Sequence, residues 1–302
     1  MKLTIIIIGY NTSKELEVCL ESINKQKTIK KNIDVLYIDD GSTDNSVEIF
    51  NSFELKFYKK CIVHKKNLGR NHARNSGIIN AKGSWCLFIN SNIFLNDDVV
   101  DKYLNEIIKT NYNILTSNIK YICSDKQFEL YLNNSKRAIN GYIKKQTIPY
   151  YYLLFSNACI KTSVLKKSAF NKKFSSYGGS EMEFSYKLNQ KNKILFVPNI
   201  VCTRLNHPSL INHIIRLEEF GKNNLFFLLK KIKPKKLPYV YKFFKLFFNK
   251  GSFLFFPFLY LIRSFIIKFL IVSPNILSLK LIKCILGLSI LIGITKHSSF
   301  SK

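Results

Sequence analysis

The stretch Tyr37-Ile38-Asp39-Asp40-Gly41-Ser42-Thr43-Asp44 decides how the first part of this chain folds. It ends an apolar run that begins at Ile33, and it does so with two adjacent carboxylates. We predict a strand over 33–38 and a helix over 45–53, joined by a sharp turn that Gly41 permits. In an open parallel α/β sheet, ligands bind at the carboxyl ends of the strands. Asp39 and Asp40 would thus meet a base or a ribose, although Asp40 and Asp44 also suit a purely structural role as helix caps.

The segments on either side of this stretch continue an alternation of strands and helices. Strands are expected at 3–8, 57–63 and 85–89, and helices at 14–25, 71–81 and 97–109. Gly83, after Lys82, is expected to cap the helix at 71–81. The alternation predicts a parallel sheet with right-handed crossovers. After Asn113 it loosens into short strands at 114–122, 157–161 and 194–197, with helices at 163–169 and 181–190.

Charge is distributed unevenly along the chain. The formal net charge is +28, and residues 201–302 carry 17 Lys and Arg against 2 acidic residues, with no acidic residue after Glu219. Such a surface suits an anionic partner, either nucleic acid or acidic lipid. The same region is rich in Phe, Leu and Ile, which a bilayer interface requires and a nucleic-acid groove does not. No helix-turn-helix, zinc or stacked-aromatic motif is present, and we therefore expect an anionic membrane surface and no nucleic acid.

Two long apolar runs close the chain. The first, 253–272, has Arg263 at its middle, where a cation is costly in a bilayer. The break Ser273-Pro274-Asn275 precedes the second run, 276–295. We predict two helices that lie in or dip into the cytoplasmic leaflet, with lysines at the headgroups. A transmembrane pair, or helices that only complete a globular core, are the alternatives.

Other classes of protein fit the sequence less well. The seven cysteines are widely spaced and never form Cys-x-x-Cys, which is typical of reduced core residues in a cytosolic protein. The apolar segment Leu3–Ile8 is too short for a signal peptide and indicates a buried strand. The turn after it lacks the glycine pattern of a dehydrogenase.

Five segments in sequence order carry a resemblance to a known family. They are Ile5-Ile6-Ile7-Ile8-Gly9-Tyr10-Asn11, Ile38-Asp39-Asp40-Gly41-Ser42-Thr43-Asp44, 67–77 (NLGRNHARNSG), 83–92 (GSWCLFINSN) and 177–188 (YGGSEMEFSYKL). Together they resemble the family 2 glycosyltransferases of the GT-A fold, over roughly Lys2 to His207. The resemblance implies an α/β fold of GT-A type, with a Rossmann-like nucleotide-binding sheet that has helices on both faces. Residues 1–210 would form the catalytic domain, with a nucleotide-binding half (1–112) and an acceptor half (113–210). Residues 211–302 would form a basic, hydrophobic, helical membrane-associating region.

The resemblance also implies roles for individual residues. Tyr10, Asp39 and Asp40 would hold the nucleotide base and ribose of the donor, and Arg74 would face the base or the phosphates. Glu181 occupies the position of the family's catalytic Asp, and would take the proton of the acceptor hydroxyl. Glu183, three residues after Ser180, fits a capping box and is expected to be structural.

Asn90-Ser91-Asn92 departs from the family pattern. The family has Asp-x-Asp here, which binds Mg²⁺ or Mn²⁺ on the donor diphosphate, whereas this chain has two amides. Arg204 would contact the diphosphate, and His207 would complete a metal site with Asn92. Three explanations stay open: a metal bound weakly by Asn and the diphosphate, stabilisation of the leaving group by cations alone, or a degenerate enzyme.

The resemblance implies an inverting glycosyltransferase that moves a sugar from a nucleotide sugar to a glycan or lipid-linked acceptor, and we expect the donor to be a UDP-sugar. It would build a surface polysaccharide or glycolipid at the inner face of the cell membrane. The alternative is a catalytically impaired homologue that binds a nucleotide or a partner protein.

Overall fold

The computed structural model describes residues 2–27, 32–174, 176–246, 252–272 and 277–297. Their contacts divide the chain into two compact units. Unit 1 comprises residues 1–122, 135–172 and 184–206, and unit 2 comprises 123–134, 173–183 and 207–302. Unit 2 therefore joins the C-terminal region to two segments from the middle of the sequence. Whether the predicted bounds 1–210 and 211–302 separate independent folding domains stays a prediction.

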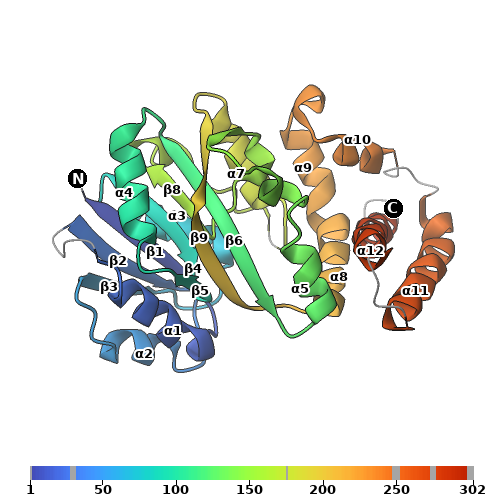
Figure 1. Cartoon of the computed structure of the whole chain (residues 1–302). Helices are drawn as coiled ribbons and strands as arrows, with labels where there is room; N and C mark the ends of the chain where they lie inside the picture. Colours follow the sequence, from blue (N-terminus) through green and yellow to red (C-terminus); the bar gives the residue numbers. More distant parts are fainter. Residues whose placement is uncertain (1, 28–31, 175, 247–251, 273–276, 298–302) are drawn as a thin grey trace. The chain divides into compact units, whose positions relative to one another are not determined.

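Unit 1 is built on one mixed sheet (Figure 1). Within the described residues the sheet has nine strands, in the order β3-β2-β1-β4-β8-β6-β9-β5, with β7 paired to β9. The strands are β1 (Leu3–Gly9), β2 (Ile33–Asp39), β3 (Tyr58–Val63), β4 (Trp85–Asn90), β5 (Ile93–Leu95), β6 (Ile114–Cys123), β7 (Gln146–Ile148), β8 (Ala158–Lys161) and β9 (Ile194–His207). The pairs β1–β2, β1–β4 and β2–β3 are parallel, which confirms that part of the prediction. The pairs of β8, β7 and β5 are antiparallel, so the sheet is mixed beyond its parallel part.

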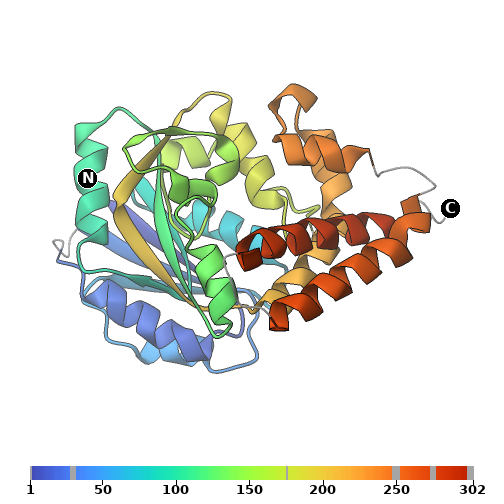
Figure 2. The same cartoon turned by 45° about the vertical axis from the view of Figure 1, so that its right-hand side comes forward.

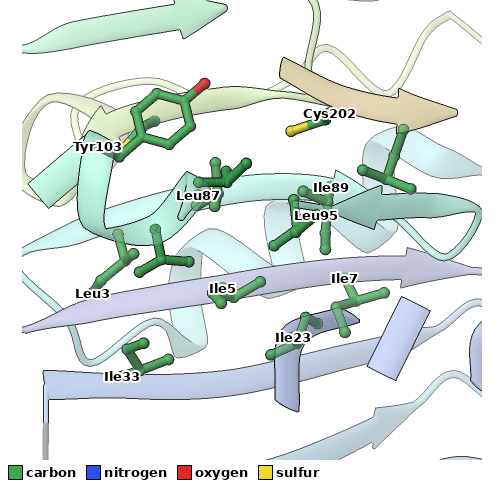
Figure 3. Packing of buried hydrophobic residues seen from close by; sticks show 14 of the residues in the cluster. Leu3, Ile5, Ile7, Ile23, Ile33, Leu87, Ile89, Leu95, Tyr103 and Cys202 are labelled. Carbon is green, nitrogen blue, oxygen red and sulfur yellow. The ribbon is translucent and has the colours of Figure 1, made fainter. Parts of the chain in front are cut away.

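Both faces of β1, β2 and β4 are buried up to Ile89, as the uninterrupted apolar runs predict, whereas the edge strand β3 is exposed or half-buried. On one face Leu3, Ile5 and Ile7 of β1 lie beside Ile33, Leu87 and Ile89 of the neighbouring strands (Figure 3). The helices α1 (Ser13–Asn24), α2 (Ser46–Ser52) and α4 (Val99–Lys109) supply buried side chains to this cluster. Side chains alternate along a strand, so the even-numbered residues of β1 point to the opposite face.

That opposite face is covered by α3 (Arg70–Asn80). Gly77 lets the helix approach the sheet, because a Cβ there would lie 2.6 Å from Cγ2 of Ile6. The predicted cap at Gly83 is wrong, since Ala81 follows the last helical turn. Gly83 instead lies against β1, where its backbone N–H donates to Oγ1 of Thr4 at 2.8 Å and leaves no room for a side chain.

The second half of the sheet contains elements that the sequence did not reveal. β5, β7 and the helix α5 (Lys126–Leu132) were not predicted, and β9 extends ten residues beyond the expected end at Val197. α6 (Thr162–Leu165) and α7 (Ser180–Asn189) match the predicted helices, although α6 is shorter. β9 pairs with both β5 and β7, and these long-range pairings fix its length.

Unit 2 is helical. Its elements besides α5 are α8 (Leu210–Glu219), the π-helical segment η4 (Phe220–Asn224), α9 (Leu225–Lys231), α10 (Tyr239–Lys245), α11 (Phe256–Val272) and α12 (Leu277–Thr295). Two glycines let α12 contact α8 and η4 backbone to backbone. A Cβ on Gly293 would lie 2.1 Å from the carbonyl oxygen of Glu218, and one on Gly221 would lie 2.3 Å from that of Ile290. The predicted break at Ser273–Asn275 lies outside the described residues.

A charged cluster holds α11 and α12 against α8. Arg263 is 7% exposed, and its guanidinium donates to Oε1 of Glu218 and, at 3.4 Å, to Oγ of Ser289. Nζ of Lys296 donates to the other carboxylate oxygen of Glu218 at 2.9 Å. A buried cation requires such a partner. Arg263 is thus neutralised inside unit 2.

We expect unit 2 to lose stability on acidification through Glu218. Burial alone would raise the pKa of this carboxyl, but the hydrogen bonds and charges of Arg263 and Lys296 outweigh burial and lower the pKa below its ordinary value of 4.5. A lowered folded-state pKa gives stability that is present above the ordinary pKa and lost as the pH falls through the folded value. Thermal unfolding measured from neutral pH down to about pH 3 should show this loss, and the Glu218→Gln variant should be less stable at neutral pH and show a smaller dependence on pH. Equal pH dependence in both proteins would contradict the assignment.

Along the described parts of the chain, no helix combines the length and the apolarity needed to cross a bilayer. Cys19, Cys86, Cys123, Cys159 and Cys202 are buried free thiols, as predicted for core residues. Cys61 is half-buried, and Cys284 is exposed and does not fit that prediction.

Candidate functional site

The turns that follow β1 and β2 form one hydrogen-bonded structure at the carboxyl edge of the sheet. The backbone N–H of Asn11 donates to Oγ of Ser42 at 2.9 Å, and Oδ1 of Asn11 accepts from the N–H of Thr43 at 2.8 Å. Asn11 has a φ of 51°, a left-handed conformation that Asn tolerates. Tyr10, just before it, is 44% exposed. The phenol ring of Tyr10 is therefore accessible beside the end of β1.

Asp39 is fully buried and organises the turn after β2. Its Oδ1 accepts from the backbone N–H groups of Gly41, at 3.0 Å, and Ser42, at 2.8 Å. Its Oδ2 accepts from the hydroxyls of Tyr37, at 3.2 Å, and Ser42. Four donors fill the usual capacity of a carboxylate. Gly41 has a φ of 78°, and a Cβ there would lie 2.4 Å from the carbonyl carbon of Lys66, so the turn demands glycine.

Asp40 is 2% exposed and binds the loop that precedes α3. Its Oδ1 accepts from the N–H of Leu68, at 3.1 Å, and its Oδ2 from the N–H of Gly69, at 2.8 Å. Nδ1 of His64 lies 2.8 Å from Oδ1 of Asp40, and Nε2 of the same ring lies 2.9 Å from Oγ of Ser76. Asp40 thus ties β2, β3 and α3 together. His64 and Ser76 were missed by the sequence analysis, because only the pairing of β2 with β3 brings His64 beside Asp40.

The structural alternative for Asp44 is confirmed, whereas Asp40 does not cap α2. Oδ1 of Asp44 accepts from the N–H and the hydroxyl of Ser46 at the start of α2, and Oδ2 accepts from the N–H of Ser13 at 2.9 Å. Desolvation raises the pKa of Asp44, but these hydrogen bonds outweigh it and lower the pKa below its ordinary value. The proposed contacts of Asp39 and Asp40 with a donor nucleotide stay predictions.

Arg74 lies on α3 and is 2% exposed. Its guanidinium carbon lies 5.8 Å from the ring centre of Phe155 and 5.2 Å from that of Phe170, within the range of cation–π contact. The next residue, Asn75, exchanges two hydrogen bonds of 2.9 Å with the backbone of Phe170. The structure thus places Arg74 among aromatic rings. Its predicted contact with the base or the phosphates stays a prediction.

The end of β4 brings Asn90 to the same edge as Asp39. Both flank the end of β1, since Ile8 pairs with Asn90 and Gly9 pairs with Asp39. Nδ2 of Asn92 donates to the carbonyl oxygen of Leu205 at 2.9 Å. Strand β5 then continues beside β9, where Ile93 pairs with Arg204. Unit 1 therefore places Tyr10, the two aspartates and Asn90 at the ends of β1, β2 and β4, with Asn92 and Arg204 joined to this edge through β5 and β9.

Arg204 is half-buried, and its buried Nε has no hydrogen-bond partner within the residues that the structure describes. The neighbouring Asn206 has a φ of 49° and donates through Nδ2 to Oε1 of Glu15 at 3.0 Å. This contact joins the end of β9 to the first turn of α1. Along the backbone, Arg204 pairs with Ile93, which directly follows Asn92.

The donor atoms at the end of β4 do not suit a divalent cation. Mg²⁺ and Mn²⁺ prefer anionic oxygens, and Asn90 and Asn92 offer amides only. Among the described residues no cluster of three or more His, Cys, Asp or Glu side chains has the arrangement of a metal site. His207, the other predicted ligand, belongs to unit 2. There Nδ1 of His207 lies 2.9 Å from the carbonyl oxygen of Pro208, and the ring lies against Phe128 and His213.

Glu181 lies in unit 2 at the start of α7, and is half-buried. The preceding Gly178 and Gly179 both have a φ of 84°. Side chains on these glycines would clash with Phe220 and Phe174, because the Cβ positions lie 2.8 Å from ring carbons. Nδ2 of Asn224 lies within 3.1 Å of the carbonyl oxygens of Ser176, Tyr177 and Gly178. Asn224 and Phe220 thus position the loop before Glu181, a role that no sequence signal indicated.

Comparison with known proteins decides the family. The model of glycosyl transferase family 2 matches residues 4–174, more than half of the chain. This chain belongs to glycosyl transferase family 2. The family assignment, made from the sequence as a resemblance, is confirmed.

Relatives with known names and structures agree with this family. The chain is 29% identical over 107 residues to the poly(ribitol-phosphate) beta-glucosyltransferase of Bacillus spizizenii, covering 35% of this chain and 17% of the relative. The crystal structure of residues 1–349 of S. aureus TarS in complex with UDP-GlcNAc matches with a TM-score of 0.59 and 18% identity, over 73% of this chain and 66% of that one. The mannosyltransferase PcManGT of Pyrobaculum calidifontis, in complex with GDP-Man and Mn²⁺, matches with a TM-score of 0.59 and 15% identity, over 78% and 66%.

These likenesses confirm the GT-A-like mixed sheet with flanking helices. The chain is also 26% identical over 185 residues to the teichoic acid poly(glycerol phosphate) polymerase of Staphylococcus epidermidis, covering 58% of this chain and 24% of the relative. The chain spans less than half the length of the first curated relatives that it matches.

Proposed function

We propose that this protein transfers a sugar from a UDP-sugar to a glycan or lipid-linked acceptor, with inversion, in the synthesis of a surface polysaccharide or glycolipid. The observation that carries the proposal is the placement of Tyr10, Asp39 and Asn90 at the ends of β1, β2 and β4, with Arg204 of β9 paired to Ile93 shortly after Asn90, all within unit 1. An open edge of this kind suits an elongated, charged ligand such as a nucleotide diphosphate sugar. The UDP-GlcNAc complex of TarS supports UDP as the donor nucleotide.

In the proposed mechanism the hydroxyl oxygen of the acceptor attacks the anomeric carbon of the donor sugar. The bond from that carbon to the phosphate oxygen breaks, and the nucleoside diphosphate leaves with the electron pair. The carboxylate of Glu181 takes the proton of the hydroxyl. The ring of Tyr10 packs on the nucleotide base. The turns that Asp39 and Asp40 stabilise by hydrogen bonds keep the ribose-binding part of the site in a fixed conformation.

Charge on the leaving diphosphate needs a partner. Because the donor set at Asn90 and Asn92 does not suit a divalent cation, no step of the proposed mechanism depends on a metal. We assign the role to Arg204, whose guanidinium is always charged and binds phosphate oxygens in pairs.

The donor and the need for a metal are tested together by thermal unfolding. We expect UDP-sugars to raise the Tm of the purified protein more than GDP-sugars, and to do so equally in EDTA and in Mn²⁺. Turnover of the stabilising donor, measured as release of UDP, would then separate an active enzyme from the impaired homologue. Stabilisation without any turnover across acceptors would favour the impaired homologue, and stabilisation only with Mn²⁺ would overturn the metal-free proposal.

Removal of the Arg204 guanidinium should weaken transfer strongly. The Arg204→Gln variant is expected to lose roughly a hundredfold in kcat, since one charged donor at a developing anion contributes about 10²- to 10³-fold. Arg204→Lys keeps the charge and should retain part of the activity. A surface control is Lys102→Gln, which removes a cation whose Nζ bonds Asp98 and Asn199. Equal kcat in the Gln and Lys variants would contradict a role for the charge.

We also propose that the protein works at the inner face of the cell membrane, on an acceptor presented there. The basic C-terminal region supports this localisation, because its lysines suit an anionic surface.

A further inference from the structure

One side of α11 exposes an unusual series of large apolar side chains. Phe258, Leu261 and Phe265 are 62%, 67% and 72% exposed, and Phe269 continues the series at 45%. Their spacing of three or four residues places them on one side of the helix. We call these four residues the α11 stripe.

The opposite side of α11 is fixed inside unit 2. Leu259 is 8% exposed, and Arg263 is bound to Glu218 and Ser289. The helix thus turns Arg263 inward and the apolar α11 stripe outward, the reverse of the usual helix at a water-facing surface. Since the buried ion pair sets the rotation of the helix, the folded unit presents the stripe to its surroundings. Contiguous exposed apolar surface of this kind marks an interaction site.

Lysines gather at one end of the same pair of helices. α11 and α12 lie side by side (Figure 2) and are joined by residues 273–276, so the end of α11 meets the start of α12. Lys268 on α11 and Lys280 and Lys283 on α12 are exposed there. The sequence has no acidic residue after Glu219, and neither helix carries a carboxylate that would neutralise these lysines.

We propose that the α11 stripe inserts into one leaflet of an anionic bilayer, while Lys268, Lys280 and Lys283 bind lipid phosphates. Aromatic side chains suit the boundary between headgroups and acyl chains, and lysines suit the anionic surface above it. A second copy of the chain fits less well, because it would bring two lysine clusters of like charge together. The proposal deepens the proposed function by defining the membrane-binding surface, and it gives a binding mode that needs no spanning helix.

Sedimentation with vesicles tests the proposal on the full chain. Wild-type protein should bind vesicles that contain anionic phosphatidylglycerol, bind those of phosphatidylcholine alone far more weakly, and lose binding as salt rises. A stripe variant, Phe258→Ser, Leu261→Ser and Phe265→Ser combined, should bind the anionic vesicles about tenfold less or weaker still. A charge variant, Lys268→Glu, Lys280→Glu and Lys283→Glu combined, should lose binding to a similar degree.

Matched variants in unit 1 test whether vesicle binding depends on this surface or only on the total apolar area and net charge of the protein. The apolar control changes three exposed isoleucines of unit 1 to Ser, namely Ile79, Ile108 and Ile143. The charge control changes three exposed lysines of unit 1 to Glu, namely Lys109, Lys144 and Lys167. Both controls should bind like the wild type, and the Tm of the stripe variant should stay unchanged because its residues are exposed.

Several results would overturn the proposal. The first is that the wild-type protein does not bind anionic vesicles, and the second is that the unit 1 controls lose as much vesicle binding as the stripe and charge variants. The third is that the wild type is a dimer and the stripe variant is a monomer, which would show that the stripe binds a second copy of the chain. Activity on a water-soluble acceptor should persist in the stripe variant. If the wild type does not transfer sugar to the water-soluble acceptor, the proposed transferase function is contradicted. The vesicle measurements would still test the membrane-binding surface, because they do not depend on transfer.

Discussion

The Glu181→Gln variant should lose roughly a thousandfold in kcat, while its affinity for the donor nucleotide stays close to that of the wild type. General base catalysis contributes about 10²- to 10⁴-fold, and the amide of Gln cannot accept the proton of the acceptor hydroxyl. Gln has nearly the same shape as Glu, so the loop before α7, held by Asn224 and Phe220, should keep its conformation. Steady-state release of UDP and titration with UDP would measure the two quantities separately.

Two further variants sharpen this test. Glu181→Asp shortens the side chain by one methylene but restores the residue usual for the family, so it should keep a measurable part of the activity. Glu48→Gln, an exposed carboxylate on α2, controls for the loss of one negative charge and should behave as the wild type. Full transfer by Glu181→Gln would reject its role as the base, and loss of nucleotide binding together with transfer would indicate a role in the structure instead.

Replacement of Asp39 by Ala should lower the free energy of unfolding by about 3 kcal/mol or more. The change leaves four donors without their acceptor at a position with 0% exposure, and each buried unsatisfied donor costs about 1–3 kcal/mol. The turn after β2 also binds Asn11, next to Tyr10, so a loosened turn should weaken donor binding as well. Urea unfolding and nucleotide titration would measure the two effects.

Asp39→Asn is the isosteric comparison for this prediction. Its amide oxygen can still accept from the N–H groups of Gly41 and Ser42, and the hydroxyls of Tyr37 and Ser42 can rotate to accept from its NH₂ group. The loss of stability should therefore be clearly smaller than in Asp39→Ala. Asp97→Ala, an exposed carboxylate before α4, should change stability by less than about 0.5 kcal/mol. A similarly small change in Asp39→Ala would contradict the structural role assigned to its four hydrogen bonds.

Much of the fold of residues 2–112 could be predicted, because its signals are local. The run that ends at Asp39, the run that ends at Asn90 and the helices between them follow from apolar periodicity and from residues that favour turns. Their meeting at one edge followed from the rule that carboxyl ends of parallel strands share an edge. The antiparallel part of the sheet was predicted less well, since β5, β7 and the far end of β9 exist only through pairing with distant strands.

The roles of individual side chains divide in the same way. The sequence predicts that Asp39 and Asp40 lie at the end of a strand. It does not predict their hydrogen-bond partners. The turn brings Ser42 to Asp39, and the pairing of β2 with β3 brings His64 to Asp40. Arg74 carries no local signal for a position between Phe155 and Phe170, which lie about 80 to 100 residues further along the chain.

The sequence by itself determined the family, the order of the parallel strands and helices, and the loss of both carboxylates at Asn90 and Asn92. These three features depend only on the types of residues and on their short separations in the sequence, which do not require a folded chain. Only the tertiary structure decided that Arg204 lies beside the degenerate position, that Glu218 neutralises Arg263, and that α11 therefore turns its phenylalanines outward. Each of these three features depends on a contact with a residue more than 40 positions away in the sequence. Packing and strand pairing across the whole fold select that residue, and local sequence patterns do not.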